Sequence, residues 1–231
     1  MKQINLKHFA KAGILFCMFF TTFGCGKAEL DEEIRSQLKV GVFGGSISVF
    51  QESETAKNMW RAKLNINVTS CGVGGAGFSS VTRDNVPFQI ERAKIFDVYI
   101  LWASTNDVVK STVGNSYEED ERTQDGGILK SIDLIRRKNS KAVILFFTSL
   151  PRFDDDDCYE KIPSFVEDQI AICEKYQIPY LDQYRRCAFN KDNYQSYYLE
   201  DKIHLSNAGY ASIAPMQVEF IREHIKDYVK K

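Results

Sequence analysis

Val42-Phe-Gly-Gly-Ser-Ile-Ser48 is the stretch that decides the fold, because it joins a strand pattern to a helix through a sharp turn. The apolar run from Leu38 to Phe43 predicts a buried strand, and two glycines then permit a tight backbone. A serine at this point would lie at the carboxyl edge of the sheet, where open α/β folds bind ligands. The N–H groups of the next helix would point at the same spot. A Gly-Gly-Ser turn is more often only a turn, so Ser46 needs support from later stretches before it is a candidate nucleophile.

The composition is that of an ordinary globular protein without a basic surface. The chain has 231 residues, a formal net charge of −1 and 44% hydrophobic residues. This length suits one α/β domain better than two. Because binding to nucleic acid needs a concentrated basic face that neutralises phosphates, we expect no nucleic-acid partner.

The first 37 residues have the pattern of an export signal followed by a linker. A positively charged start precedes an uncharged apolar run over residues 12–23, which is shorter than a membrane span of about 20 residues and typical of a signal peptide. Thr22-Phe-Gly-Cys25 resembles the bacterial lipobox, although Thr22 stands where leucine is usual, and the resemblance implies that Cys25 carries lipid. An ordinary secretory signal cleaved nearby is the alternative.

We therefore expect three segments: a signal peptide of the lipoprotein type over residues 1–24, a tether over residues 25–37 and a folded domain over residues 38–231. The protein would be exported to the cell envelope of a bacterium. It would be held to the membrane through its lipid anchor only.

Within the folded domain, apolar runs alternate with amphipathic patterns. We expect strands over residues 38–43, 65–69, 96–102, 142–148 and 178–181, and helices over residues 52–63, 87–94, 117–138, 162–176 and 207–229. Such alternation predicts an α/β fold with a parallel sheet and helices on both sides. Gly126 and Gly127 are expected to kink or split the third of these helices.

A glycine-rich loop, Cys71-Gly-Val-Gly-Gly-Ala-Gly77, follows the second strand. It satisfies the G-x-G-x-x-G pattern of dinucleotide sites, but it does not open a helix directly, and no acidic residue ends the next strand. A flexible loop is a second interpretation. We favour a third, in which the loop brings backbone N–H groups close to a ligand, and we expect no cofactor.

The stretch Ser104-Thr-Asn-Asp107 ends the third expected strand. If the strands are parallel, this end lies at the same edge of the sheet as Ser46. An asparagine side chain there can donate a hydrogen bond to a developing oxyanion, although Asn and Asp are also common in simple turns. Asn106 is therefore a candidate oxyanion donor.

The stretch Asp201-Lys-Ile-His204 precedes the last helix. His8 lies in the signal segment, and His224 lies near the end of a surface helix, where a positive charge suits the helix dipole. His204 is therefore the only plausible imidazole base, and Asp201 is close enough to hold its second ring nitrogen. A simple turn leading into the helix is the alternative.

Other reactive side chains have simpler interpretations. The folded domain has four cysteines, namely Cys71, Cys158, Cys173 and Cys187. An exported chain permits disulfides, but the sequence does not choose among the three full pairings, and we expect Cys173 to be a buried free thiol. The acidic run over residues 154–157 could bind a divalent cation, but we expect a solvated loop there and no metal site.

Taken together, these stretches resemble the SGNH or GDSL-type serine hydrolases. Gly-Gly-Ser46 is similar to the nucleophile block, Gly75 to the oxyanion glycine, Asn106 to the asparagine block and Asp201–His204 to the base block. The resemblance implies a flavodoxin-like, three-layer α/β/α sandwich with a five-stranded parallel sheet.

The same resemblance implies ester hydrolysis without a metal or a cofactor. Ser46 would be the nucleophile, His204 the base and Asp201 its orienting carboxylate. The backbone N–H groups of Ser46 and Gly75 and the amide of Asn106 would form the oxyanion hole. The family usually has Asp where this chain has Gly45 and Gly where it has Ser104, and these departures bear on loop geometry and substrate fit.

The expected function is that of an exported esterase that removes a short acyl group, acetyl above all, from a carbohydrate through an acyl-serine intermediate. The loop over residues 182–202 is rich in tyrosine, which suits sugar rings, and it lacks the aliphatic run that a long acyl chain needs. A lysophospholipase or lipase is one alternative. The other is a catalytically silent protein that binds glycans through Tyr184, Tyr194, Tyr197 and Tyr198. The sequence leaves the oligomeric state open.

Overall fold

The computed structural model describes residues 38–114 and 120–229. The expected signal peptide, the tether and the lipidation site at Cys25 lie outside the described residues and stay predictions. Within the described ranges, no helix combines the length and the apolar character needed to cross a membrane.

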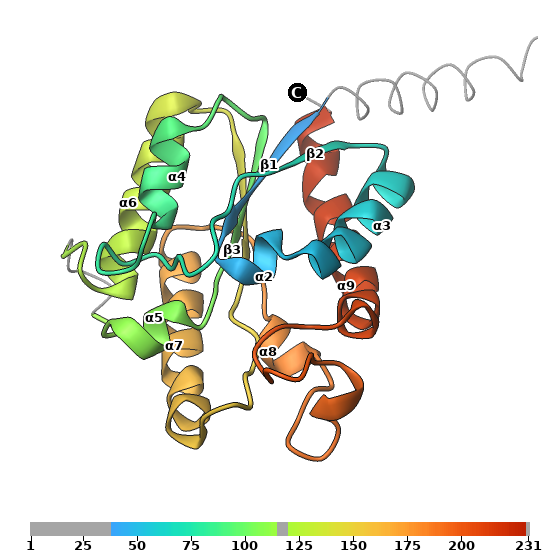
Figure 1. The fold of residues 1–231 in the computed structure, drawn as a ribbon. Coiled ribbons are helices and arrows are strands. Elements are labelled where there is room, and N and C mark those ends of the chain that lie inside the picture. The colour runs from blue at the N-terminus through green and yellow to red at the C-terminus, as the bar shows by residue number, and fades with distance from the viewer. Residues whose placement is uncertain (1–37, 115–119, 230–231) are drawn as a thin grey trace, which may run out of the picture.

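A five-stranded, all-parallel sheet forms the centre of the described part of the chain (Figure 1). In spatial order its strands are β2 (Asn67–Ser70), β1 (Lys39–Gly44), β3 (Val98–Trp102), β4 (Val143–Phe147) and β5 (Tyr180–Leu181). This order is that of flavodoxin-like sheets, in which ligands bind where the strand order reverses. The reversal lies between β1 and β3, at whose carboxyl edge Ser46 follows β1.

Helices cover both faces of this sheet, as Figure 1 shows, with α3 and α9 on one side and α4, α6 and α7 on the other. The helices described are α2 (Ser46–Val49), α3 (Glu54–Leu64), α4 (Val86–Arg92), α5 (Asn106–Lys110), α6 (Gln124–Lys138), α7 (Asp156–Lys175), α8 (Gln183–Arg186) and α9 (Asn207–Val229), with 3₁₀ turns η1 (Gln51–Ser53) and η2 (Tyr194–Ser196). The three-layer α/β/α sandwich is therefore confirmed.

The central strand β3 is buried on both of its faces. Successive side chains of a strand point to opposite faces, so Ile100 and Trp102 pack in the cluster with α3 and α9. Tyr99 and Leu101 pack in the cluster with α4 and α6. A strand between two helical layers has to be apolar throughout, which explains why this run is so clear in the sequence.

The acidic run over residues 154–157 is exposed, as expected, but only its first half is a loop, because α7 begins at Asp156. The side chain of Asp155 accepts a hydrogen bond from the N–H of Cys158 at 2.8 Å and caps α7, as short polar side chains commonly do. Helix α7 therefore begins at Asp156 and not at residue 162, and Pro163 lies inside it. No group of His, Cys, Asp and Glu side chains within the described ranges is arranged to hold a metal ion.

The two glycines of α6 do not split this helix, which runs without a break from Gln124 to Lys138. A Cβ atom on Gly126 would lie 2.1 Å from the carbonyl oxygen of Asp120, and one on Gly127 would lie 2.1 Å from that of Phe78. These glycines let two loops approach the first turn of α6 closely. The helix begins at Gln124, later than expected, where the side chain of Thr123 caps it.

The cysteines of the described part of the chain, Cys71, Cys158, Cys173 and Cys187, are free thiols. Cys173 is fully buried, as expected, and its burial raises the pKa of its thiol well above the ordinary value.

Candidate active site

Ser46 is presented by a turn that only small residues can make. A Cβ atom on Gly44 would lie 2.3 Å from the carbonyl oxygen of Trp102 on the neighbouring strand. The side chain of Gln89 fixes the backbone of Gly44 on both sides, accepting from its N–H at 3.1 Å and donating to its carbonyl at 3.0 Å. β1 therefore ends in a fixed position, and Ser46 begins α2 two residues later.

Side chains from two other helices hold the short helix α2. The hydroxyl of Tyr210 on α9 donates to the carbonyl of Ile47 at 2.7 Å. The buried Lys57 on α3 donates to the carbonyl of Ser48 at 3.0 Å and to the hydroxyl of Ser70 at 2.5 Å. A four-residue helix has little stability of its own, so these bonds account for its fixed place beside the sheet.

Ser46, His204 and Asp201 lie in one line of hydrogen bonds. Nε2 of His204 lies 2.7 Å from Oγ of Ser46, and Nδ1 lies 2.6 Å from Oδ2 of Asp201. The other carboxylate oxygen, Oδ1, accepts the backbone N–H groups of Ile203 and His204, both at 2.9 Å. Asp201 therefore has two roles, because Oδ1 stabilises the turn into His204 and Oδ2 orients the His204 ring.

The carboxylate of Asp201 is electrostatically tied to this ring. Burial acts to raise the pKa of Asp201, but hydrogen bonds from the ring and backbone of His204 and from the N–H of Ile203 outweigh it and lower the pKa. Asp201 is therefore ionised at neutral pH. An ionised carboxylate at this distance holds the ring in the orientation that points Nε2 at Ser46.

Phe50 stacks on the imidazole of His204, which the sequence analysis did not foresee. The two ring centroids are 4.4 Å apart, and the ring planes differ by 7°. Phe50 follows α2 directly and is 36% exposed. Its place four residues after Ser46 gives no hint of this contact, because the partner ring comes from the far end of the chain.

The glycine loop lies against the turn that carries Ser46. The carbonyl oxygen of Ala76 would be 2.5 Å from a Cβ atom on Gly45. Gly75 has a φ of +81°, and a Cβ there would meet no atom within 4 Å, so conformation and not space requires this glycine. The loop runs on without a helix until α4, and so it lacks the helix start that a dinucleotide pyrophosphate uses.

Asn106 begins α5 and reaches the same loop. Its side-chain Nδ2 donates to the carbonyl of Ala76 at 2.9 Å and contacts the hydroxyl of Ser104 at 3.1 Å. The structure therefore brings Asn106 and the Gly75–Ala76 segment to the turn at Gly45.

Asp107 fixes the next part of the loop, and the sequence analysis gave it no role. Its carboxylate is fully buried and accepts hydrogen bonds from the N–H of Phe78 at 2.7 Å and from the N–H and hydroxyl of Ser79 at 2.9 and 2.7 Å. Burial raises the pKa of Asp107 although these bonds oppose the change. Its position directly after Asn106 was the available signal.

Three of the tyrosines before His204, Tyr194, Tyr197 and Tyr198, pack against phenylalanines. Tyr198 is buried, and its hydroxyl donates to the carbonyl of Pro151 at 2.6 Å, so the expectation that it contacts a glycan is wrong. Tyr194 stacks on Phe153 with centroids 4.9 Å apart. Tyr184, Tyr194 and Tyr197 are half-buried and keep part of their surface open.

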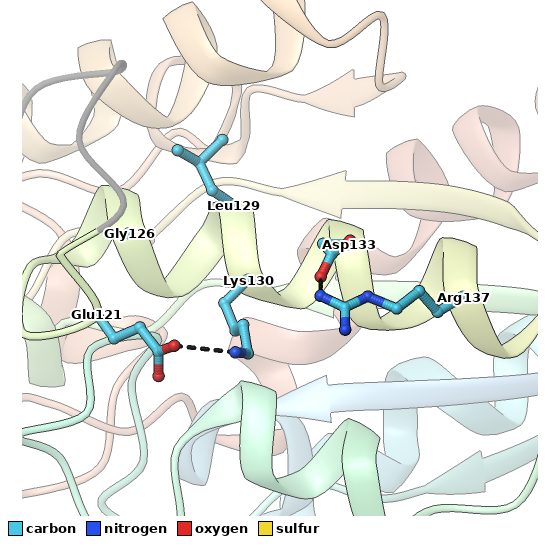
Figure 2. A pocket seen from close by; sticks show the side chains of 6 residues that line it. All are labelled: Glu121, Gly126, Leu129, Lys130, Asp133 and Arg137. Carbon is cyan, nitrogen blue, oxygen red and sulfur yellow. Dashed lines mark hydrogen bonds and ion pairs between the residues drawn. The ribbon is translucent and has the colours of Figure 1, made fainter.

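A surface hollow of about 250 Å³ on α6 is separate from this cluster. Figure 2 shows the residues that line it, namely Glu121, Gly126, Leu129, Lys130, Asp133 and Arg137. Glu121 pairs with Lys130 at 3.0 Å, and Asp133 pairs with Arg137 (Figure 2). Because these charges neutralise one another and no nucleophile is among them, the hollow offers no comparable chemistry.

Comparison with known proteins identifies a family model and solved structures to which the chain is similar. Residues 42–212 match the sequence model of the GDSL-like Lipase/Acylhydrolase family. The matched segment includes Ser46, Gly75, Asn106, Asp201 and His204. No curated protein matches the chain in sequence.

Solved structures show the same fold at low sequence identity. A protein from Lactobacillus plantarum has a TM-score of 0.70 and 17% identity, covering 81% of this chain and 98% of its own. A possible lipase from Chitinophaga pinensis has a TM-score of 0.65 and 18% identity, with the same coverage. An acylhydrolase proposed for Bacteroides fragilis has a TM-score of 0.61 and 18% identity, covering 91% of this chain and 97% of its own.

Proposed function

Because the chain belongs to the GDSL-like Lipase/Acylhydrolase family of ester-hydrolysing serine hydrolases, we propose that Ser46 is its nucleophile, His204 its base and Asp201 the orienting carboxylate. The observation that carries this proposal is the pair of distances at His204, 2.7 Å to Oγ of Ser46 and 2.6 Å to Oδ2 of Asp201. A ring held between a hydroxyl and a carboxylate can take the hydroxyl proton and pass it on.

In the first half of the reaction, Oγ of Ser46 attacks the ester carbonyl while Nε2 of His204 takes its proton. Asp201 stabilises the positive ring that results. The N–H groups of Ser46 and Gly75 and the amide of Asn106 donate to the oxyanion, where such donors act most strongly in the transition state. His204 then protonates the leaving alcohol, and an acyl-serine remains.

In the second half, a water molecule gives its proton to the same Nε2 and attacks the acyl carbon. The oxyanion forms again at the same donors. Its collapse releases the carboxylic acid, and the proton returns from His204 to Oγ of Ser46. No group outside this cluster is needed to balance the two steps.

The substrate we propose is a short acyl ester, acetyl above all, on a carbohydrate. The support is the loop over residues 182–202, which leads into Asp201 and contains tyrosine in place of a run of aliphatic residues. Tyr184, Tyr194 and Tyr197 keep part of their surface open, and such rings suit the C–H faces and hydroxyls of sugars. Export to the cell envelope of a bacterium and a lipid anchor at Cys25 belong to the same proposal.

The test compares turnover of acetyl, butyryl, octanoyl and palmitoyl esters of one leaving group, with acetylated polysaccharides alongside. We expect kcat/KM to fall steadily with chain length and acetate to be released from the polysaccharides. A maximum at octanoyl or beyond would point to lipid substrates. Labelling by a fluorophosphonate probe, absent from Ser46→Ala, tests the nucleophile, and a wild type that neither reacts nor turns over would favour the silent glycan-binding protein.

A further inference from the structure

Three polar atoms crowd the place where a side chain at residue 45 would begin. A Cβ atom on Gly45 would lie 2.5 Å from the carbonyl oxygen of Ala76, 2.8 Å from Oγ of Ser104 and 2.9 Å from Nδ2 of Asn106. Real Cβ atoms essentially never approach other atoms within 3.0 Å. Glycine at residue 45 is therefore required by the carbonyl of Ala76 together with the two side chains that follow β3.

The same three atoms bond to one another in a closed triangle. Oγ of Ser104 donates to the carbonyl oxygen of Ala76 at 2.7 Å. Nδ2 of Asn106 lies 2.9 Å from that carbonyl and 3.1 Å from Oγ of Ser104. Ser104 is only 4% exposed, so water does not replace these partners easily.

The shape of this triangle decides how the amide of Asn106 is used. The three distances of the triangle place the carbonyl oxygen of Ala76 and the hydroxyl oxygen of Ser104 about 50° apart as seen from Nδ2 of Asn106. The two N–H bonds of an amide, in contrast, diverge by about 120°. One N–H directed between the two acceptors serves both of them in a shared hydrogen bond. The second N–H then points away from both and is left for another acceptor.

We propose that Ser104 is a positioning residue for Asn106. Its hydroxyl, with the carbonyl of Ala76, holds one N–H of the Asn106 amide and thereby aims the other at the oxyanion. This inference rests on the proposed function, in which Asn106 donates to the oxyanion. Ser104 itself touches neither substrate nor the reacting atoms.

Gly45 and Ser104 are coupled by the same geometry. The hydroxyl of Ser104 occupies space into which a side chain at residue 45 would extend, and it also bonds to the carbonyl of Ala76, which is the nearest obstacle to such a side chain. The two departures from the family pattern, glycine at residue 45 and serine at residue 104, therefore meet in one cluster.

The first test is Ser104→Ala, with turnover measured on an activated acetyl ester. We expect kcat to fall about threefold to tenfold, the range for loss of one hydrogen bond. KM should be unchanged, because a wrongly oriented donor lowers the stabilisation of the transition state more than that of the bound substrate. Ser131→Ala is the matched control, since its buried hydroxyl bonds to the carbonyl of Gly127 on α6, away from the site. The control should retain the kcat of the wild type, even where its Tm falls.

The second test is a cycle of Gly45→Asp, Ser104→Gly and the double variant. Gly45→Asp alone should lose most fluorophosphonate labelling and turnover, because its side chain meets all three atoms. The double variant should regain part of the labelling and turnover that Gly45→Asp loses, since removal of the hydroxyl removes one of the three contacts and frees the carbonyl of Ala76, which accepts from that hydroxyl, to shift. Where Gly45→Asp fails to fold, recovery of soluble, labelled protein in the double variant is the same result.

The outcomes separate the two proposals. An active wild type whose kcat is unchanged by Ser104→Ala would overturn the positioning role and leave the proposed function standing. A double variant no better than Gly45→Asp would overturn the coupling. A wild type inert toward every ester and probe would overturn the proposed function and this inference with it.

Discussion

Replacing Phe50 by leucine should slow the enzyme through His204, although Phe50 lies outside the line of hydrogen bonds. The ring of Phe50 lies flat on the imidazole, with centroids 4.4 Å apart and planes within 7° of parallel. The imidazole becomes positive while Ser46 is being acylated, and an aromatic face attracts a cation. The stack therefore favours the transition state over the resting enzyme.

The size of the effect follows from the exposure of the stack. Phe50 is 36% exposed, and cation–π contacts at exposed sites contribute about 0.5–1 kcal/mol. Since about 1.4 kcal/mol corresponds to a factor of ten, Phe50→Leu should lower kcat by about twofold to fivefold. Phe50→Tyr keeps an aromatic face and should stay close to the wild type.

The assay is steady-state turnover of an acetyl ester at pH 7–8 with wild type, both Phe50 variants and a matched control. Phe88→Leu is that control, because Phe88 is 39% exposed and lies on α4, away from His204. Equal kcat in Phe50→Leu and wild type would refute the reasoning. A change in KM alone would also refute it and would make Phe50 a substrate contact.

Other changes should separate the roles of the remaining residues. His204→Ala should abolish turnover, whereas His224→Ala should leave initial rates unchanged, because the His224 ring bonds to the carbonyl of Phe220 in its own helix; the reverse order would refute the choice of base. Asn106→Ala should lower kcat by about 10²–10³-fold with little change in KM, and an effect on KM alone would contradict this. Asp107→Asn should lower the free energy of unfolding by about 1–3 kcal/mol, because a side-chain amide N–H would then face backbone N–H groups that now donate to the carboxylate. Denaturant unfolding measures this change, and an unchanged midpoint would count against the prediction. Cys25→Ala should move the protein from the membrane fraction to the soluble one, as fractionation with fatty-acid labelling would show, and label retained in the variant would argue against the anchor.

The strands could be predicted because the sheet imposes a simple pattern on the sequence. β3 and β4 lie between two helical layers, so their residues have to be apolar on both faces, and turn residues bound each run. The expected strand over residues 142–148 differs from β4 by one residue at each end. Sheet order does not follow from such runs, and it was available only through the family resemblance.

Helix boundaries were less predictable, and α7 shows the physical reason. The sequence analysis placed the helix start at residue 162, although α7 begins at Asp156 and continues through Pro163, which lacks the N–H for one backbone bond. In the folded chain, packing of Ile162, Phe165 and Val166 against neighbouring helices holds the helix together across the proline. A local rule was outweighed by tertiary contacts that the sequence does not display.

In the site, the sequence could indicate which residues meet but not what holds them. The positions of Ser46, Asn106 and His204 follow from blocks of recognisable order. The contact of Asp107 with Phe78 spans 29 residues, and the stack of Phe50 on His204 joins the two ends of the domain. Such contacts depend on the final packing. The position of Asp107 directly after Asn106 was an available signal, but it does not identify Phe78 and Ser79 as the partners of Asp107.

The 158 positions between Ser46 and His204 also bear on how the enzyme is made. Ser46 leaves the ribosome early, and the strands of the described sheet have all emerged once Leu181 is out, yet the proposed base has not emerged at that point. Tyr210, which anchors the helix of Ser46, comes later still, on the helix that covers one apolar face of the sheet. The proposed base, the bond that anchors the helix of Ser46 and the helix α9 that covers one face of the sheet therefore all reach the nascent chain in one late step. Until then it exposes an apolar face of the kind that chaperones bind, and it hydrolyses nothing.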